Sequence, residues 1–489
     1  MIGDLSKLAI AWALSAACLL AGPGSPLADA AEHGDTATLS ALLKQGVDIS
    51  ATQADGMTAL HWAAYRDDLD LAKALVEEGT DVSAANRYGI TPLSLACTNG
   101  DGAMVELLLT AGADANTSLR GGETALMTAA RTGKLGAVKA LLAHGADVNA
   151  RSAYKGQTAL MWAAAEGHAE VVKALLEAGA DLRTALKSGF TAFLFAVREG
   201  RIGVVNVLLE AGADPNETIR PEDGAGRGLR AGTSALLLAV TNAHFELASK
   251  LLDAGADPDA DLPGYTVLHA IASVRDPGVG DNDPAPEGSG NMSSLEFVRK
   301  IAAKGANLNA RMTKNVNLGN TRLNKRGATP FFVAAQSADS ELMRVLADLG
   351  ADPDLTNEDN TTALMAAAGV GTRSPGEDAG AETEVIAALQ VALDLGADIN
   401  AINDNGETVM HAAAYKNLPA VVEFLNEKGA DINVWNKQNK QGWTPLAIAM
   451  GYRFGNFKPS EVTVAALQRI FEATGVAPAP ARTDNRSDY

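Results

Sequence analysis

The sequence has 489 residues, of which 47% are hydrophobic, 20% are charged and only 5% are aromatic. This length and apolar content allow several domains or one long array, and the scarcity of aromatic residues favours thin layers of helices packed through small side chains. The net charge of −19 disfavours binding to nucleic acid or to an anionic membrane, because an acidic surface repels phosphate groups.

The first 24 residues have the pattern of an export signal. A lysine precedes the apolar stretch 8–21, which Gly-Pro-Gly at 22–24 ends. The stretch is short for a membrane span and has the usual length of a signal sequence. We expect cleavage between residues 24 and 30, either after 22–24 or after Ala-Asp-Ala at 28–30. A retained membrane anchor and a lipoprotein linked through Cys18 are the alternatives.

Residues 25–214 repeat two short motifs at a regular spacing. One is a Gly-x-Thr turn that enters an apolar helix, and the other is a Gly-Ala-Asp turn that closes a second helix. Counted along the chain from Thr58 to Asp431, the distance from the Thr to the following Asp or Asn is 23 residues in eight of ten pairs, and Ser25 to Asp48 has the same spacing. A whole repeat is therefore about 33 residues, which predicts a solenoid whose helical hairpins bury their apolar faces against one another.

Residues 215–403 keep these motifs but carry long insertions. The helices of the eighth and tenth repeats are separated by the loop-like segments 276–292 and 371–384, and the turns after Asp214 and Asn307 are also lengthened. Insertions in solenoids become surface loops, often on the binding side, so this stretch is where we expect any specific site. Neutral drift of loop length is the alternative.

The array returns to regular spacing in residues 404–475. Its final repeat begins at Thr444 and lacks the closing Gly-Ala-Asp turn, which predicts a capping end. Residues 476–489 contain proline and alanine and then mixed charges, a composition that predicts a disordered tail.

These motifs resemble those of the ankyrin-repeat family. The residues that carry the resemblance include Gly-Met-Thr-Ala-Leu-His-Trp-Ala-Ala at 56–64, Gly-Ile-Thr-Pro-Leu at 89–93, Val-Val-Lys-Ala-Leu-Leu-Glu-Ala-Gly-Ala-Asp at 171–181 and Gly-Glu-Thr-Val-Met-His-Ala-Ala at 406–413. The resemblance covers about residues 25–475 and implies an all-α solenoid of about 12 helix-turn-helix repeats with β-turn or hairpin fingers. The chain also looks like the long exported ankyrin-repeat proteins of bacteria.

The resemblance further implies which positions face the concave groove that binds partners. They are the residue between Gly and Thr in each finger, the end of each first helix, and the tyrosines of the fingers. The predicted partner-binding residues are Met57, Tyr65, Arg66, Tyr88, Ile90, Glu123, Arg131, Tyr154, Phe190, Arg198, Tyr265, Tyr415 and Trp443. Cations also gather in the fingers, at Arg87, Arg120, Arg151, Lys155, Arg183 and Lys187. We therefore expect the groove to accept an acidic or mixed-charge protein surface.

The sequence predicts no catalytic, cofactor or metal site. His61, His269 and His411 lie three residues after a Thr and are expected to support the turn by hydrogen bonds. Cys97 occupies a slot that holds alanine in other repeats, which predicts a buried structural thiol. No zinc-protease motif, cysteine pair or phosphate-binding glycine loop is present, and Asp-Asn-Asp at 281–283 lacks the rest of a calcium loop.

The function expected from these features is that of a non-catalytic protein-interaction scaffold. We expect a monomer that is periplasmic or secreted, with no membrane span beyond its N-terminal signal and no nucleic-acid partner. One alternative is an accessory or maturation factor for a secreted or periplasmic enzyme. The other is an enzyme built on the inserted loops of repeats eight to ten, although the sequence indicates no reaction for it.

Overall fold

The computed structural model describes residues 24–100, 102–222, 231–275, 286–316, 322–372, 375–376, 379–453 and 459–482. The expected export segment, residues 1–24, lies almost wholly outside these residues, as do parts of both long insertions. Within the described ranges every regular element is a helix, as the repeat pattern predicts. The helices belong to two compact units, Met1–Ala213 and Asp214–Tyr489.

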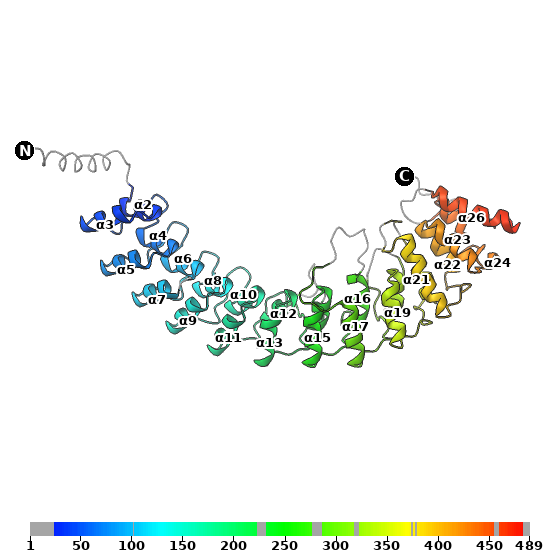
Figure 1. The fold of residues 1–489 in the computed structure, drawn as a ribbon, viewed down its shortest axis with the longest axis horizontal. Coiled ribbons are helices and arrows are strands. Elements are labelled where there is room, and N and C mark those ends of the chain that lie inside the picture. Colours follow the sequence, from blue (N-terminus) through cyan, green and yellow to red (C-terminus); the bar gives the residue numbers. More distant parts are fainter. Residues whose placement is uncertain are drawn as a thin grey trace, which may run out of the picture. The chain divides into compact units, whose positions relative to one another are not determined.

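Unit 1, Met1–Ala213, consists of stacked helical hairpins (Figure 1). Its helices are α2 (Pro26–His33), α3 (Thr36–Lys44), α4 (Ala59–Arg66), α5 (Leu69–Glu77), α6 (Pro92–Asn99), α7 (Gly102–Thr110), α8 (Ala125–Thr132), α9 (Leu135–Ala143), α10 (Ala159–Glu166), α11 (Ala169–Glu177), α12 (Ala192–Arg198) and α13 (Ile202–Glu210). Even-numbered helices are the first helices of the repeats, and odd-numbered helices are the second.

Unit 2, Asp214–Tyr489, has the same construction with longer second helices near its end. Its helices are α14 (Ala235–Thr241), α15 (Phe245–Asp253), α16 (Val267–Arg275), α17 (Ser294–Ala303), α18 (Pro330–Gln336), α19 (Ser340–Asp348), α20 (Ala363–Ala368), α21 (Glu382–Asp394), α22 (Val409–Lys416), α23 (Pro419–Glu427), α24 (Ile432–Trp435), α25 (Pro445–Ala449) and α26 (Glu461–Thr474). No helix in the described part of the chain is both long and apolar enough to cross a membrane.

The first helices begin at a hydroxyl cap. The Thr58 hydroxyl accepts a hydrogen bond from the His61 N–H at 3.3 Å, and most later first helices begin in the same way. The Ser25 hydroxyl accepts from the Ala28 N–H at 3.2 Å, so residue 25 begins the first repeat, as the 23-residue spacing predicts. After the second helix, Gly179 adopts a left-handed φ of +88°, which a residue with a side chain rarely tolerates.

The interior is built from small side chains that let neighbouring hairpins approach closely. First helices pack on first helices, as α4 does on α6, and second helices pack on second helices, as α7 does on α9. Ala63 and Ala64 of α4 are fully buried beside Leu60. Such layers leave no room for larger side chains without displacing a neighbouring repeat.

Carboxamide side chains join the Gly-Ala-Asp turns of successive repeats. Asn149 accepts a hydrogen bond from the Asp181 N–H at 2.8 Å and donates to the Gly179 carbonyl at 3.1 Å. Asn116 and Asn216 bridge to their following turns in the same way. These bridges were not predicted, although their signal, an Asn two residues after the turn Asp, is visible in the sequence.

The fingers are turns joined by backbone hydrogen bonds. The Arg87 N–H donates to the Asp55 carbonyl and the Ala153 N–H to the Gly121 carbonyl, both at 3.0 Å. Extended pairing in the described fingers is limited to isolated antiparallel bridges, such as that between Ser118 and Thr124. The structure therefore has turn fingers, and the expected hairpins are present only in this minimal form.

The C-terminal segment differs from the prediction of a disordered tail. After α26 the chain turns at Gly475, and residues 476–482 follow the last finger, where Asn436 hydrogen-bonds to Ala477 and Ala479. The Arg482 N–H donates to the Gly442 carbonyl at 2.7 Å. Composition alone predicted disorder, whereas specific backbone contacts hold this part of the tail; residues 483–489 lie outside the described residues.

Candidate functional site

The three histidines of the Thr-x-x-His slot are structural. The Nδ1 atom of His61 accepts from the Thr58 N–H at 3.1 Å, so its Nε2 carries the proton and donates to the Ile90 carbonyl at 3.0 Å. His269 and His411 make the same two kinds of contact. Burial lowers the pKa of His61, and it lowers the pKa of His269 and of His411 to about 4. The predicted supporting role is confirmed.

Cys97 is a buried thiol in α6, as predicted. Burial raises its pKa to about 12, so the sulfur stays protonated and a poor nucleophile at any physiological pH.

The structure brings together the two kinds of position predicted to face the groove. Glu123, just before its Thr cap, pairs with Arg131, eight residues later at the end of α8, at 3.2 Å. Phe190 lies under the guanidinium of Arg198, also eight residues later, with 5.3 Å from Arg198 Cζ to the ring centroid. These contacts place the finger residue and the end of the first helix on one side of a repeat.

Most of the predicted contact residues are accessible. Tyr65, Tyr88 and Tyr154 are 55%, 58% and 92% exposed, which is unusual for large aromatic side chains. The other predicted residues with some accessible surface are the exposed Arg66 and Arg131 and the half-buried Ile90, Glu123, Arg198 and Tyr265.

Four of the predicted partner-binding side chains have little accessible surface. The structure buries Met57, Phe190, Tyr415 and Trp443. Phe190 packs on Phe195 with ring centroids 5.2 Å apart, beneath the Arg198 guanidinium. The Tyr415 hydroxyl donates to the Glu407 carboxylate at 2.9 Å inside the last repeats. Contacts within the array cover these side chains, so they stabilise the array and offer little surface to a partner.

The buried Tyr415 belongs to a polar cluster between the last repeats of unit 2. Asn439 donates to the Glu407 carboxylate at 3.2 Å and to the Tyr415 hydroxyl at 3.1 Å. The guanidinium of Arg453 lies over the Tyr415 ring, with 5.9 Å from Cζ to the centroid. Burial raises the pKa of Glu407 and of Tyr415 and lowers that of Arg453 to about 10. The cluster is closed to solvent, so it orients the final repeats rather than binding a substrate.

Unit 1 carries a row of accessible aromatic and cationic side chains on its fingers and first-helix ends. Tyr65 meets Trp62 edge to face, with ring centroids 5.6 Å apart. Arg131 reaches the next repeat, where its Cζ lies 5.4 Å from the Trp162 ring centroid. Tyr154 follows on the next finger. We call the three tyrosines Tyr65, Tyr88 and Tyr154, together with Arg131, which lies against the Trp162 ring, the aromatic row.

A cleft of about 530 Å³ lies between two neighbouring fingers of unit 1, beside Tyr154. Its charged lining residues are Arg151, Lys155 and Lys187, with no acidic residue among the residues that line it. Arg151 donates to the Ala185 carbonyl at 2.9 Å, which fixes its guanidinium against the next finger. The cleft is thus a basic surface on an acidic protein.

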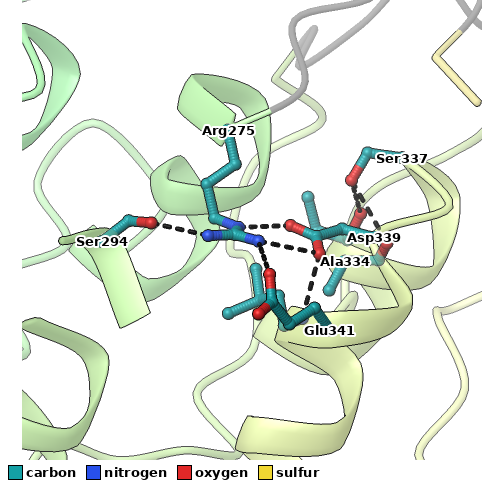
Figure 2. Close-up of polar contacts among 8 residues, drawn as sticks. Arg275, Ser294, Ala334, Ser337, Asp339 and Glu341 are labelled. Atoms are coloured by element: carbon teal, nitrogen blue, oxygen red, sulfur yellow. Dashed lines mark hydrogen bonds and ion pairs between the residues drawn. The ribbon is translucent and has the colours of Figure 1, made fainter. Parts of the chain in front are cut away.

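Unit 2 contains a cavity of about 790 Å³ among the ends of α16, α19, α21 and α22. Arg275, the last residue of α16, is the central group of one wall (Figure 2). Its guanidinium pairs with both carboxylate oxygens of Asp339, reaches Glu341 at 2.9 Å and donates to the Ser294 hydroxyl at 2.6 Å. Arg275 therefore links the eighth repeat to the ninth.

The cavity wall carries an excess of negative charge. Its acidic residues are Asp339, Glu341, Glu382 and Glu384, and its basic residues are Arg275 and Lys416. Lys416 donates to the Ala379 carbonyl, and Glu382 accepts from the Ala420 N–H. No histidine or cysteine lines the cavity, and no group of His, Cys, Asp or Glu in the described residues has a metal-binding arrangement. Ion pairs of Arg275 with Asp339 and Glu341, and hydrogen bonds of Lys416 and Glu382 to backbone groups, thus join neighbouring repeats at this wall.

The cavity borders both predicted insertions. Arg275 directly precedes the first, Ser294 follows it, and Gly376 and Gly380 come from the second. Residues 276–285 and part of the second insertion lie outside the described residues. The insertions were predictable from the sequence, but the pairing of Arg275 with Asp339 was not, because 64 residues separate the two partners.

The stacked hairpins, capped first helices and turn fingers define a repeat protein that presents an extended surface. Comparison with known families agrees: a family model described as ankyrin repeats (3 copies) matches residues 27–119, 79–152, 95–185, 126–219 and 380–458. These matches span more than half of the chain, so the protein belongs to the ankyrin-repeat family. A search of curated proteins returned no match. Membership of this family indicates a protein-protein interaction scaffold, and the family is generally non-catalytic.

Proposed function

We propose that the protein is a non-catalytic scaffold that binds an acidic or mixed-charge segment of a partner protein on the finger face of unit 1. The observation that carries the proposal is the aromatic row together with the basic cleft beside Tyr154. Exposed tyrosine and arginine side chains are the residues that most often dominate the energy of protein interfaces.

The charge of the fingers selects the kind of partner. Arg87, Arg120, Arg151, Lys155 and Lys187 are exposed on the successive fingers of repeats three to six. A cluster of cations on a chain with a net charge of −19 attracts an acidic segment, while the negative charge elsewhere opposes the close approach of a long polyanion. Binding of an acidic segment should therefore weaken as salt concentration rises.

The place of action is also part of the proposal. The apolar stretch at 8–21 supports export from the cytoplasm, to the periplasm or beyond, where the protein would act as a monomer. Sequencing of the mature N-terminus from the native host tests this directly: a first residue between 24 and 31 supports cleavage, and an intact Met1 on a cytoplasmic protein contradicts it.

The binding face is tested by affinity capture with matched variants. The full chain and the double variant Tyr88→Ala/Tyr154→Ala are each incubated with the envelope fraction of the native host. A double variant on the second helices, Lys139→Gln/Lys173→Gln, serves as control, because both lysines are exposed away from the fingers. We expect the affinity of the finger variant for the captured partner to fall by on the order of tenfold or more, while the control variant binds the partner as tightly as the unaltered chain.

Two results would contradict the proposal. One is a partner that binds the finger variant as tightly as the unaltered chain. The other is salt-insensitive binding of a strongly basic partner, since the cationic fingers would repel that partner and a charge-selected complex would weaken as salt concentration rises.

A further inference from the structure

The C-terminal segment 476–482 lies against the last finger of unit 2, residues 436–442. Asn436 binds two points of the segment: its Nδ2 donates to the Ala477 carbonyl and its Oδ1 accepts from the Ala479 N–H, both at 3.0 Å. A single carboxamide that satisfies both a backbone acceptor and a backbone donor recognises an extended peptide, because the two groups must lie on the same edge of the segment.

Two more hydrogen bonds extend the contact along the finger. Gln438 donates to the Pro480 carbonyl at 2.7 Å, and the Arg482 N–H donates to the Gly442 carbonyl at 2.7 Å. Between them the segment reads Ala-Pro-Ala-Pro-Ala-Arg. The prolines hold the chain extended, so little conformational freedom is lost when the segment binds.

The segment takes the place that a following finger takes elsewhere in the array. Between two neighbouring fingers, the Lys440 N–H donates to the Asn405 carbonyl at 2.8 Å. The Arg482 N–H makes a similar bond to the last finger, but its acceptor is Gly442 itself, one residue after the position that is equivalent to Asn405. The approach is also similar: a Cβ added to Gly406 would lie 3.3 Å from Asn439, and a Cβ added to Gly442 would lie 2.9 Å from Arg482.

We propose that residues 476–482 are a tethered peptide ligand, and that the last finger, residues 436–442, is a binding edge for an extended Ala/Pro peptide. No further finger follows residues 436–442 within the described part of the chain, so without the tail the backbone groups of this edge would be open to pairing with another chain. The tail occupies that edge within the same molecule. This inference concerns a different surface from the aromatic row and does not depend on the proposed function.

Point variants of the full chain distinguish the contribution of the tail from that of the last finger. Ala479→Pro removes the N–H that donates a hydrogen bond to Asn436 but leaves the finger intact, and proline suits the extended conformation. Ala481→Pro is the matched control, because the Ala481 N–H makes no hydrogen bond with the described residues. Asn436→Ala damages the edge and leaves the tail sequence unchanged.

Two measurements are made on each variant. The first is amide hydrogen exchange in segments 436–442 and 476–482, with exchange in unit 1 as a check on folding. The second is fluorescence anisotropy of a labelled synthetic peptide, Gly-Val-Ala-Pro-Ala-Pro-Ala-Arg. A tethered segment has an effective concentration of about 1 mM, so the unaltered chain should not bind micromolar peptide.

The proposal predicts a distinct pattern. In Ala479→Pro and in Asn436→Ala, the amide hydrogens of the tail should exchange on the order of tenfold faster than in the unaltered chain. In Ala481→Pro their exchange rate should not change. The free peptide should bind Ala479→Pro on the order of tenfold more tightly than it binds the unaltered chain, because a weakened tail competes less for an intact edge, and it should gain no affinity for Asn436→Ala. Equal exchange in all four proteins, or failure of the peptide to bind Ala479→Pro more tightly than the unaltered chain, would overturn the proposal.

Discussion

Acidification should destabilise unit 2 through two buried histidines. His269 and His411 are fully buried, and each uses Nδ1 as an acceptor from a backbone N–H, an arrangement that only the neutral ring can make. Their pKa values are lowered from 6.5 to about 4 in the folded chain. The unfolded state therefore binds more protons between these values, so stability is complete above pH 6.5 and is lost as the pH falls toward 4.

The size of the effect follows from the linkage between proton binding and folding. At pH 5 an unfolded histidine is almost fully protonated while the folded one is mostly neutral, which corresponds to about 2 kcal/mol per histidine. The two residues together should reduce the free energy of unfolding of unit 2 by about 4 kcal/mol between pH 7 and pH 5. Glu407 acts in the opposite direction, because its raised pKa favours the folded state as it protonates.

Urea denaturation at pH 7 and pH 5 measures this change. Trp435 and Trp443 are buried in unit 2, so the fluorescence of a chain whose other three tryptophans are replaced by phenylalanine reports the unfolding of this unit. The variant His269→Gln has no group that titrates at this position and should lose about half of the pH dependence, whatever its stability at pH 7. An unchanged free energy of unfolding between the two pH values, or an equal loss in the variant, would refute the reasoning.

Three further predictions concern the joints between repeats and the buried thiol. Asn149→Ala should lower the free energy of unfolding, measured by urea denaturation, by about 1 kcal/mol, because two hydrogen bonds to the next turn are lost. Arg183→Ala, at the equivalent place in the next repeat, is the control and should leave this free energy almost unchanged. Arg275→Ala should destabilise unit 2 by about 2 kcal/mol, since it leaves the poorly accessible Asp339 without its cation; a neutral effect would mean that solvent replaces the guanidinium. In a chain with Cys18 replaced by serine, Cys97 should react with a disulfide reagent at pH 8 only after denaturant is added, and rapid labelling of Cys97 in the native state would contradict its burial.

The fold was predictable from sequence because its signals are local. Thr58 caps the helix that starts at the next residue, and Gly179 ends the helix just before it, so each motif fixes its own part of a repeat. The same holds for Ser25, whose spacing from Asp48 revealed the first repeat. Positions that share a side of the repeat were also predictable, as the contact between Glu123 and Arg131 demonstrates.

Accessibility and long-range contacts were not predictable in the same way. Phe190 and Tyr415 occupy positions that face the groove in the family pattern. Phe190 is nevertheless buried against Phe195, and Tyr415 is buried with its hydroxyl hydrogen-bonded to Glu407. The pairing of Arg275 with Asp339 depends on how an insertion returns to the helix stack. The composition of the tail predicted disorder, because composition carries no information about a single asparagine that binds it.

The spacing of the fingers determines which residues of a bound peptide can contact successive fingers. Neighbouring helical layers lie about 10 Å apart, and an extended peptide rises about 3.3 Å per residue. A peptide that runs along the fingers of unit 1 would thus meet a new finger about every third residue. Cations on the fingers at Arg87, Arg120, Arg151 and Lys187 would match acidic residues at that interval better than the same number of acids in one block. The geometry of the array makes charge periodicity, rather than charge alone, the property by which such partners would differ.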